Sequence, residues 1–226
     1  ILDVAYHGST DSLLLVELQE KNGISKAEAL ANLPALFAAM TRSAKSVGPE
    51  QALRGIEVLP GVPDLLQALQ ARPDTVVGLV TGNVPEIAWL KMEAAGLADL
   101  FSTPHFGGFG GRDFCGGLNT PAGKSADREQ LVLIARAQAH RMHPGSITTH
   151  VHVGDAPADV VSGEKQSAGE EGGCGESSLS AFSLGVCTGN FKREELEGVS
   201  TQERSVVLDS MADTEACLRA LGLPAL

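Results

Sequence analysis

The sequence is poor in the residues that mark several common classes of protein. Its four cysteines lie far apart and form no CxxC pair, which argues against a zinc knuckle or a dense disulfide framework. Reduced thiols in the cytoplasm are the simplest interpretation. No apolar run approaches the roughly 20 residues needed to cross a bilayer, and no basic segment followed by an apolar stretch marks a signal peptide. We therefore expect a cytoplasmic protein without a membrane partner.

Basic residues are also few. Lys and Arg number 17 against 28 Asp and Glu, so the formal net charge is −11. Nucleic-acid and anionic-membrane surfaces favour clustered cations, and the composition argues against both kinds of partner. A small phosphorylated molecule is still compatible with this charge, because one local cation or metal ion can override the overall field.

The first 57 residues indicate a small α-helical unit. A chain of 226 residues with 43% hydrophobic residues can bury one core and a small accessory domain. Thr10 and Asp11 can cap a first helix and Ser25 a second, since each precedes apolar residues at helical spacing. Pro34 is expected to end or restart the second helix. No strand signal occurs before residue 58.

From residue 58 to the end, strand and helix patterns alternate. This alternation predicts an α/β fold, a Rossmann-like, doubly wound parallel sheet with helices on both faces. A Gly- and Glu-rich stretch at about 163–183 cannot bury a core and is expected to be a flexible insertion, on the sheet edge opposite the site. The predicted strands cover residues 75–80, 105–106, 148–153, 184–187 and 206–208.

One strand end carries two carboxylates. Residues 149–153 are expected to form a strand that ends in Gly154 and Asp155, and Asp159 follows in the first turn of the next helix. Gly154 permits a sharp exit, so both carboxylates can reach the carboxyl edge of the sheet. Hard oxygen ligands of this kind suit Mg²⁺. The alternative is that both acids only cap the helix and complement its dipole.

Two further features could hold a phosphate. Thr81, Gly82 and Asn83 follow the strand at 75–80, and a hydroxyl with successive amides at a helix N-terminus forms an anion site. Lys124 stands at the start of a helix upstream of the carboxylates and could neutralise a phosphoryl group. Lys91 and Arg128 are rivals for this cationic role.

Together these features resemble the haloacid dehalogenase superfamily, in its branch of phosphoglycolate-phosphatase-like and phosphoglucomutase-like enzymes. The second motif of that family is a hydrophobic strand ending in Thr or Ser, similar to residues 76–83. Its third motif is a Lys at a helix start, similar to Lys124, and its fourth is Gly-Asp-x-x-x-Asp, similar to residues 154–159. Segments 8–11, 59–62, 185–189 and 207–213 also look like parts of the family pattern.

The resemblance implies an architecture and a set of roles. Residues 1–57 would be a helical cap and residues 58–226 the core that carries the site. Mg²⁺ would be the cofactor and a small phosphorylated metabolite the substrate. The roles implied are metal ligands at Asp155 and Asp159, phosphate binding by Thr81, Gly82, Asn83 and Lys124, and catalysis by Thr81 and Lys124.

The first motif of the family, Asp-x-Asp-x-Thr on an opening strand, has no counterpart. Asp3 is followed by Val4 and Ala5, with no apolar strand before it, so we do not assign Asp3 as the nucleophile. The chain also begins with Ile1 rather than Met. We expect the first core strand, with the nucleophile and the acid/base, to lie upstream of Ile1. The sequence as given would then bind magnesium weakly and be inactive.

The intact protein is therefore predicted to hydrolyse a phosphomonoester through an aspartyl-phosphate. Two alternatives stay open, a catalytically inactive protein that binds a phosphorylated ligand or a partner, and a metal-independent haloacid dehalogenase. The motifs specify neither the substrate nor the oligomeric state. We do not assign roles to the His150 and His152 pair as metal ligands, to Cys187 as a nucleophile, or to Trp89 in recognition.

Overall fold

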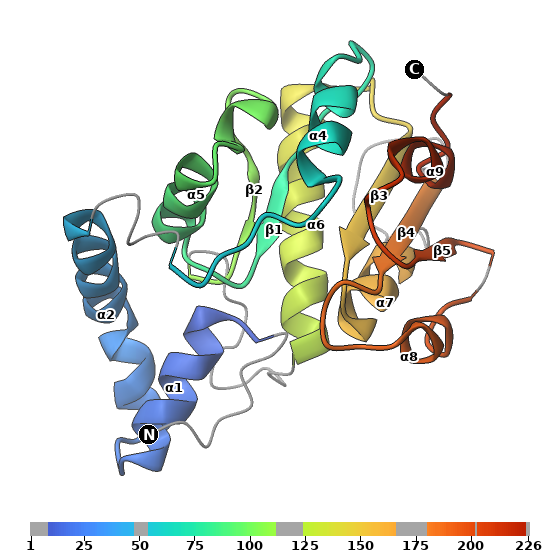
Figure 1. The fold of residues 1–226 in the computed structure, drawn as a ribbon. Coiled ribbons are helices and arrows are strands. Elements are labelled where there is room, and N and C mark those ends of the chain that lie inside the picture. The colour runs from blue at the N-terminus through green and yellow to red at the C-terminus, as the bar shows by residue number, and fades with distance from the viewer. Residues whose placement is uncertain (1–8, 48–53, 112–123, 166–179, 202, 225–226) are drawn as a thin grey trace.

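The structure is a computed structural model that describes residues 9–47, 54–111, 124–165, 180–201 and 203–224. It consists of helices and short parallel strands, which confirms the α/β class (Figure 1). The chain positions Ile1, Asp3, Val4 and Ala5, discussed above, lie outside the described residues, as do 112–123 and 166–179.

The N-terminal unit is a pair of helices, α1 (Asp11–Lys21) and α2 (Lys26–Ser46). The predicted caps are confirmed, since the hydroxyls of Thr10 and Ser25 accept hydrogen bonds at 3.3 Å from the backbone N–H groups of Leu13 and Glu28. The two helices pack around a small core of their own, in which the fully buried or nearly buried residues are Val16, Ala29 and Leu33.

Helix α2 is continuous through Pro34, so the predicted break there is wrong. A proline inside a helix forfeits the hydrogen bond to the carbonyl four residues earlier. Pro34 is exposed, whereas Leu33 and Ala29 are buried against α1. Packing of that apolar face outweighs the local cost of the proline.

The strands form two separate parallel sheets in the part of the chain that the structure describes. Strand β1 (Leu79–Thr81) pairs with β2 (Gly107–Phe109). Strand β4 (Ser180–Val186) pairs with both β3 (Thr149–Gly154) and β5 (Ser205–Leu208). The parallel strands confirm the predicted direction, but a single doubly wound sheet is not found among the described residues.

Strand β1 is also shorter than predicted. Residues 75–78 lie outside it, because Val77 pairs with Ser102 rather than with a strand. The Ser102 hydroxyl accepts from the Val77 amide at 2.9 Å, and the Ser102 amide donates to the Val77 carbonyl at 3.1 Å.

Helices connect and cover the two sheets. Helix α6 (Lys124–Met142) packs on β1, β2 and α7 (Pro157–Lys165), and α7 packs on β3 and β4, so these helices form one layer over both sheets. Helices α4 (Val62–Gln70) and α9 (Thr214–Ala220) pack together around Leu65, Ala68, Cys217 and Leu218. The other helical elements after α4 are α5 (Pro85–Ala94), the 3₁₀ helix η1 (Ala98–Leu100) and α8 (Arg193–Glu197).

The direction in which strands are added reverses between β1 and β3. From β1 the chain moves outward to β2, whereas from β3 it moves the opposite way to β4 and then β5 (Figure 1). The carboxyl ends of the strands lie at the edge from which α1 starts. In doubly wound folds, ligands bind outside the carboxyl ends of the strands at such a reversal.

At the opposite, amino edge of the second sheet, Ser180 begins β4 opposite Thr149, the first residue of β3. The predicted insertion at 163–183 is narrower than expected, because Gly163 is part of α7 and lies against Ser183 of β4. Two histidines meet near this edge, with 3.3 Å between Nε2 of His150 on β3 and Nε2 of His140 on α6.

The outer edge of β2 is sealed by a side chain. The Gln138 amide of α6 donates to the Gly107 carbonyl at 2.9 Å and accepts from the Gly107 N–H at 3.3 Å. This pair of bonds imitates the pairing of a neighbouring strand and satisfies both backbone groups of Gly107.

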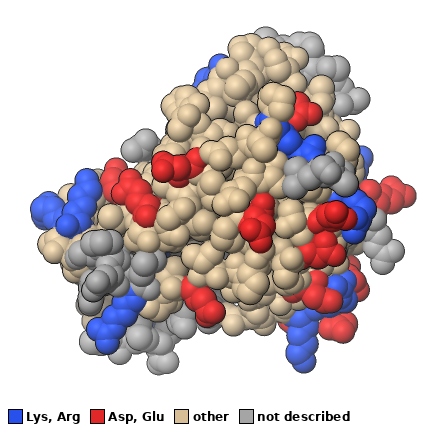
Figure 2. All heavy atoms as spheres, turned by 45° about the horizontal axis from the view of Figure 1, so that its top comes forward, with Lys and Arg blue, Asp and Glu red and all other residues tan. Residues whose placement is uncertain are grey.

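The surface carries scattered charges. On the described part of the face in Figure 2, Lys and Arg do not gather into a continuous patch, and acidic residues lie between them. Within the described ranges, no helix combines the length and apolarity needed to span a bilayer.

Candidate functional site

The predicted anion turn lies between β1 and α5. Thr81 is the last residue of β1, and its Oγ1 accepts a hydrogen bond of 3.3 Å from the Asn83 N–H. Pro85 starts α5 directly after the N-cap Val84. Thr81, Gly82 and Asn83 therefore stand at the carboxyl edge of the first sheet, at the N-terminus of a helix.

The Asn83 side chain joins this turn to two charged groups. Its Nδ2 donates to both carboxylate oxygens of Asp11, at 3.1 and 3.3 Å, and its Oδ1 accepts from Lys91 Nζ at 2.8 Å. The Val84 N–H also donates to Asp11 Oδ2, at 2.9 Å. The sequence indicated Asp11 only as a helix cap and not as a partner of Asn83, because Asn83 lies 72 residues away and no local pattern connects the two.

The segment that enters α1 crosses the carboxyl edges of β1 and β2. The Asp11 N–H donates to the Gly82 carbonyl at 2.7 Å, and the Ser12 hydroxyl donates to the Gly110 carbonyl. A β-carbon at Gly82 would collide with the backbone of Ser9. Glycine at this position therefore permits the close approach of the helical unit to the turn.

The second half of the site is the corner after β3. Asp155 is exposed at the carboxyl edge, and its carboxylate lies against Gly189, in the turn after β4. A β-carbon at Gly154 would collide with the Asp159 side chain, so glycine allows Asp159 to fold back against the end of the strand. The predicted geometry of strand, glycine and two carboxylates is present at one corner.

Asp159 has partners that the sequence did not reveal. Its side chain is 6% exposed. Its Oδ1 lies 3.0 Å from Arg128 Nε and 3.2 Å from His152 Nε2. Oδ2 accepts from the Ala156 N–H at 3.2 Å. Burial alone would raise the pKa of Asp159, but the His152 hydrogen bond and the Arg128 charge outweigh it and hold the pKa below its ordinary value.

The three candidate cations are placed differently. Arg128 pairs with Asp159, and Lys91 reaches Asn83 in the Thr81–Asn83 turn. Helix α6 begins at Lys124, one turn before Arg128, but the Lys124 side chain lies outside the described part of the chain. The described cation that reaches the Thr81–Asn83 turn is therefore Lys91.

The donors at the corner can be compared with the needs of Mg²⁺. Among the described residues, no group of three or more His, Cys, Asp or Glu is arranged to hold a metal ion. Both Asp159 oxygens have hydrogen-bonding partners, and Asp155 is exposed at the edge. Mg²⁺ takes few protein ligands and keeps water and substrate oxygens. Of the two carboxylates, the exposed Asp155 is therefore the one that a Mg²⁺ ion could reach, with water and substrate oxygens as its other ligands.

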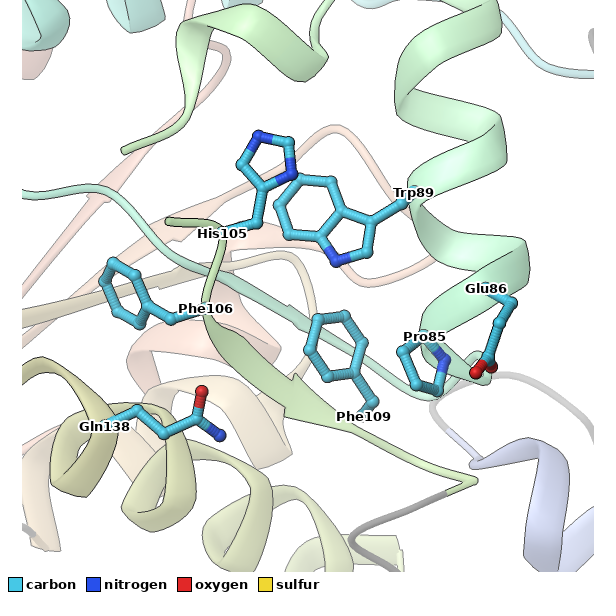
Figure 3. A pocket seen from close by; sticks show the side chains of 7 residues that line it. All are labelled: Pro85, Glu86, Trp89, His105, Phe106, Phe109 and Gln138. Atoms are coloured by element: carbon cyan, nitrogen blue, oxygen red, sulfur yellow. The ribbon is translucent and has the colours of Figure 1, made fainter. Parts of the chain in front are cut away.

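A separate cavity of about 250 Å³ lies between α5, α6 and the approach to β2 (Figure 3). Trp89 stacks on His105 beside it, with 4.0 Å between the ring centres. Among the described residues, its lining holds no Lys or Arg and includes the acidic Glu86, so this lining is unsuited to a phosphoryl group. The lining residues are Pro85, Glu86, Trp89, His105, Phe106, Phe109 and Gln138.

No protein-family model matches the chain, and no curated protein matches it.

Proposed function

We propose that the protein is a Mg²⁺-dependent phosphomonoester hydrolase of the haloacid dehalogenase type, acting on a small phosphorylated metabolite. The observation that supports this most directly is the position of the two half-sites. Thr81 ends β1 and Asp155 follows β3, on either side of the point where strand order reverses. A ligand at the carboxyl edge of that reversal would meet an anion turn on one side and a carboxylate on the other.

The anion turn would hold the phosphoryl oxygens. The Thr81 hydroxyl can donate while its oxygen accepts from the Asn83 N–H. The N-terminus of α5 adds a partial positive charge, and Lys91 adds a full one beside Asn83. Lys124 would contribute a second positive charge from the start of α6. These groups would stabilise charge on the transferred phosphoryl group.

The metal would be held by Asp155, and when bound it neutralises phosphoryl charge. Asp159 would act indirectly. Its bond from the Ala156 N–H fixes the turn that presents Asp155, and Arg128 and His152 fix Asp159 in turn. Asp159, Arg128 and His152 would thus hold the metal ligand Asp155 in position through the turn.

The nucleophile would come from a strand between β1 and β3, upstream of Ile1. The facing edges of β1 and β3 support this placement, because neither has a strand partner on that side among the described residues. An aspartate oxygen would attack phosphorus while the ester P–O bond breaks and an acid protonates the leaving oxygen. Water would then attack the aspartyl-phosphate, releasing inorganic phosphate and restoring the carboxylate.

The test is hydrolysis of 4-nitrophenyl phosphate by the intact protein, with and without Mg²⁺. Wild type should be active only with the metal, and Asp155→Asn should lose at least about a hundredfold in kcat/KM. Asp74→Asn, the same change at an exposed surface site, is the matched control. Unchanged turnover in Asp155→Asn would remove Asp155 from the site. Activity that survives EDTA would overturn the metal assignment, and an inactive protein that still binds phosphate would be a binding protein.

A further inference from the structure

The Asp11 carboxylate occupies donors at the anion turn. It receives the Asn83 side-chain amide and the Val84 N–H, and Lys91 holds the opposite side of the same Asn83 amide. We call the bonds from Asn83 and Val84 to Asp11 the Asp11 latch. It ties the start of α1, in the helical unit, to the start of α5, in the core.

Charge makes this contact specific for an anion. Lys91 brings a full positive charge to the N-terminal end of α5, where the helix dipole is already positive. The Asp11 carboxylate offsets both. A phosphoryl oxygen carries the same charge and accepts the same hydrogen bonds, so it would be attracted to the same donors. The two anions would repel each other if both were present.

We infer that Asp11 is an internal competitor for the phosphoryl group at the Thr81–Asn83 turn, and that a bound anion displaces it. The inference rests on the proposed function, since it assigns a regulation to that same anion site. Displacement would open the Asp11 latch, while the bonds from the Asp11 N–H to Gly82 and from Ser12 to Gly110 would keep α1 docked. The helical unit would thereby sense whether the turn is occupied.

The Asp11 latch predicts opposite effects on phosphate affinity for substitutions on the two sides of Asn83. Asp11→Asn removes the competing charge, and inorganic phosphate should bind roughly fivefold tighter, the factor expected from one like charge near a water-exposed ligand. Lys91→Gln should weaken binding by a similar factor. Binding is measured by calorimetry and by the fluorescence of Trp89, which is the single tryptophan and lies on α5.

Asp64→Asn is the matched control, because Asp64 is exposed and stands in the first turn of α4, as Asp11 stands in the first turn of α1. It should bind phosphate as wild type does. Amide exchange provides a second measurement that needs no variant, since phosphate should speed exchange in the first turn of wild-type α1. If Asp11→Asn fails to fold, Asp11→Ser removes the same charge with a residue that helix starts accept.

The outcomes separate the two ideas. If wild type binds phosphate and Asp11→Asn binds no more tightly, the latch is overturned and the proposed function stands. Equal tightening in Asp64→Asn would assign the effect to overall charge and would also overturn the latch. If neither wild type nor Asp11→Asn binds phosphate, with or without Mg²⁺, both the anion site and the latch are overturned.

Discussion

Arg128 Nε lies 3.0 Å from Asp159 Oδ1, and the two side chains are only 14% and 6% exposed. This pair joins the first turns of α6 to the corner between β3 and α7. It is a buried charge pair with a hydrogen-bonding histidine beside it, so the loss of one partner would leave the other charge uncompensated.

We therefore expect Arg128→Met to destabilise the fold by about 3 kcal/mol. Arg219→Gln is the control, because its pair with Glu215 is exposed, and it should cost less than about 1 kcal/mol. Urea denaturation followed by circular dichroism measures both values. A loss for Arg128→Met no greater than that for Arg219→Gln would show that the pair is not effectively buried.

Stability should fall as the solution becomes mildly acidic. Burial, with the charges of Arg136 and His140, lowers the pKa of His150 from 6.5 to about 4. The unfolded chain then binds more protons than the folded protein below pH 6.5. The stability present above that pH is lost as pH falls towards 4, by up to about 3 kcal/mol.

The measurement is the free energy of unfolding between pH 7.5 and 4.5 for wild type and His150→Asn. The variant should lose most of this pH dependence, whereas exposed His143→Asn should keep it. The pKa of Asp159 is lowered in the folded protein, so protonation of Asp159 reduces stability only near and below the ordinary carboxyl pKa. The effects of His150 and Asp159 therefore fall in different pH ranges.

Gly82→Ala should detach the helical unit from the core edge. The new methyl group would collide with the Ser9 backbone, which cannot move without straining the bond from the Asp11 N–H to Gly82. We expect a loss of about 2 kcal/mol. Gly185→Ala is the comparison, because its nearest neighbours are side-chain methyl groups at 3.3 to 3.5 Å. A milder effect for Gly82→Ala than for Gly185→Ala would contradict the close approach.

Gln138→Leu should open the outer edge of β2. Both backbone groups of Gly107 would lose their partner, at a cost of about 1 to 2 kcal/mol. Hydrogen exchange at the Gly107 amide should accelerate, and the exposed edge should promote self-association at high concentration. Exchange measured by NMR and size-exclusion chromatography check these outcomes. Unchanged exchange would mean that the side chain does not seal the edge.

Features encoded over a few residues were predictable. Thr10 and Ser25 cap the expected helices, and Pro85 starts α5, because each acts on backbone groups within one turn. The corner of Gly154, Asp155 and Asp159 follows from the same kind of local geometry.

Features that depend on distant partners were not predictable. Most of α6 and the whole of β3 lie between Arg128 and Asp159, and Asp11 meets Asn83 across 72 residues. Strand pairing is also long-range, so the sequence predicted parallel strands without the separation of β1 from β3. The expectation that Pro34 ends or restarts the helix is a local prediction that failed, because packing of Leu33 decided the conformation there.

The amino edge of the sheet offers a place for a reporter. Lys165 ends α7 and Ser180 begins β4 opposite Thr149, at the end of the strands away from Thr81 and Asp155. A fluorophore attached at the exposed Ser180 would leave the carboxyl edge open to ligands. Paired with Trp89 on α5, such a label would turn the distance between α5 and the start of β4 into an optical signal.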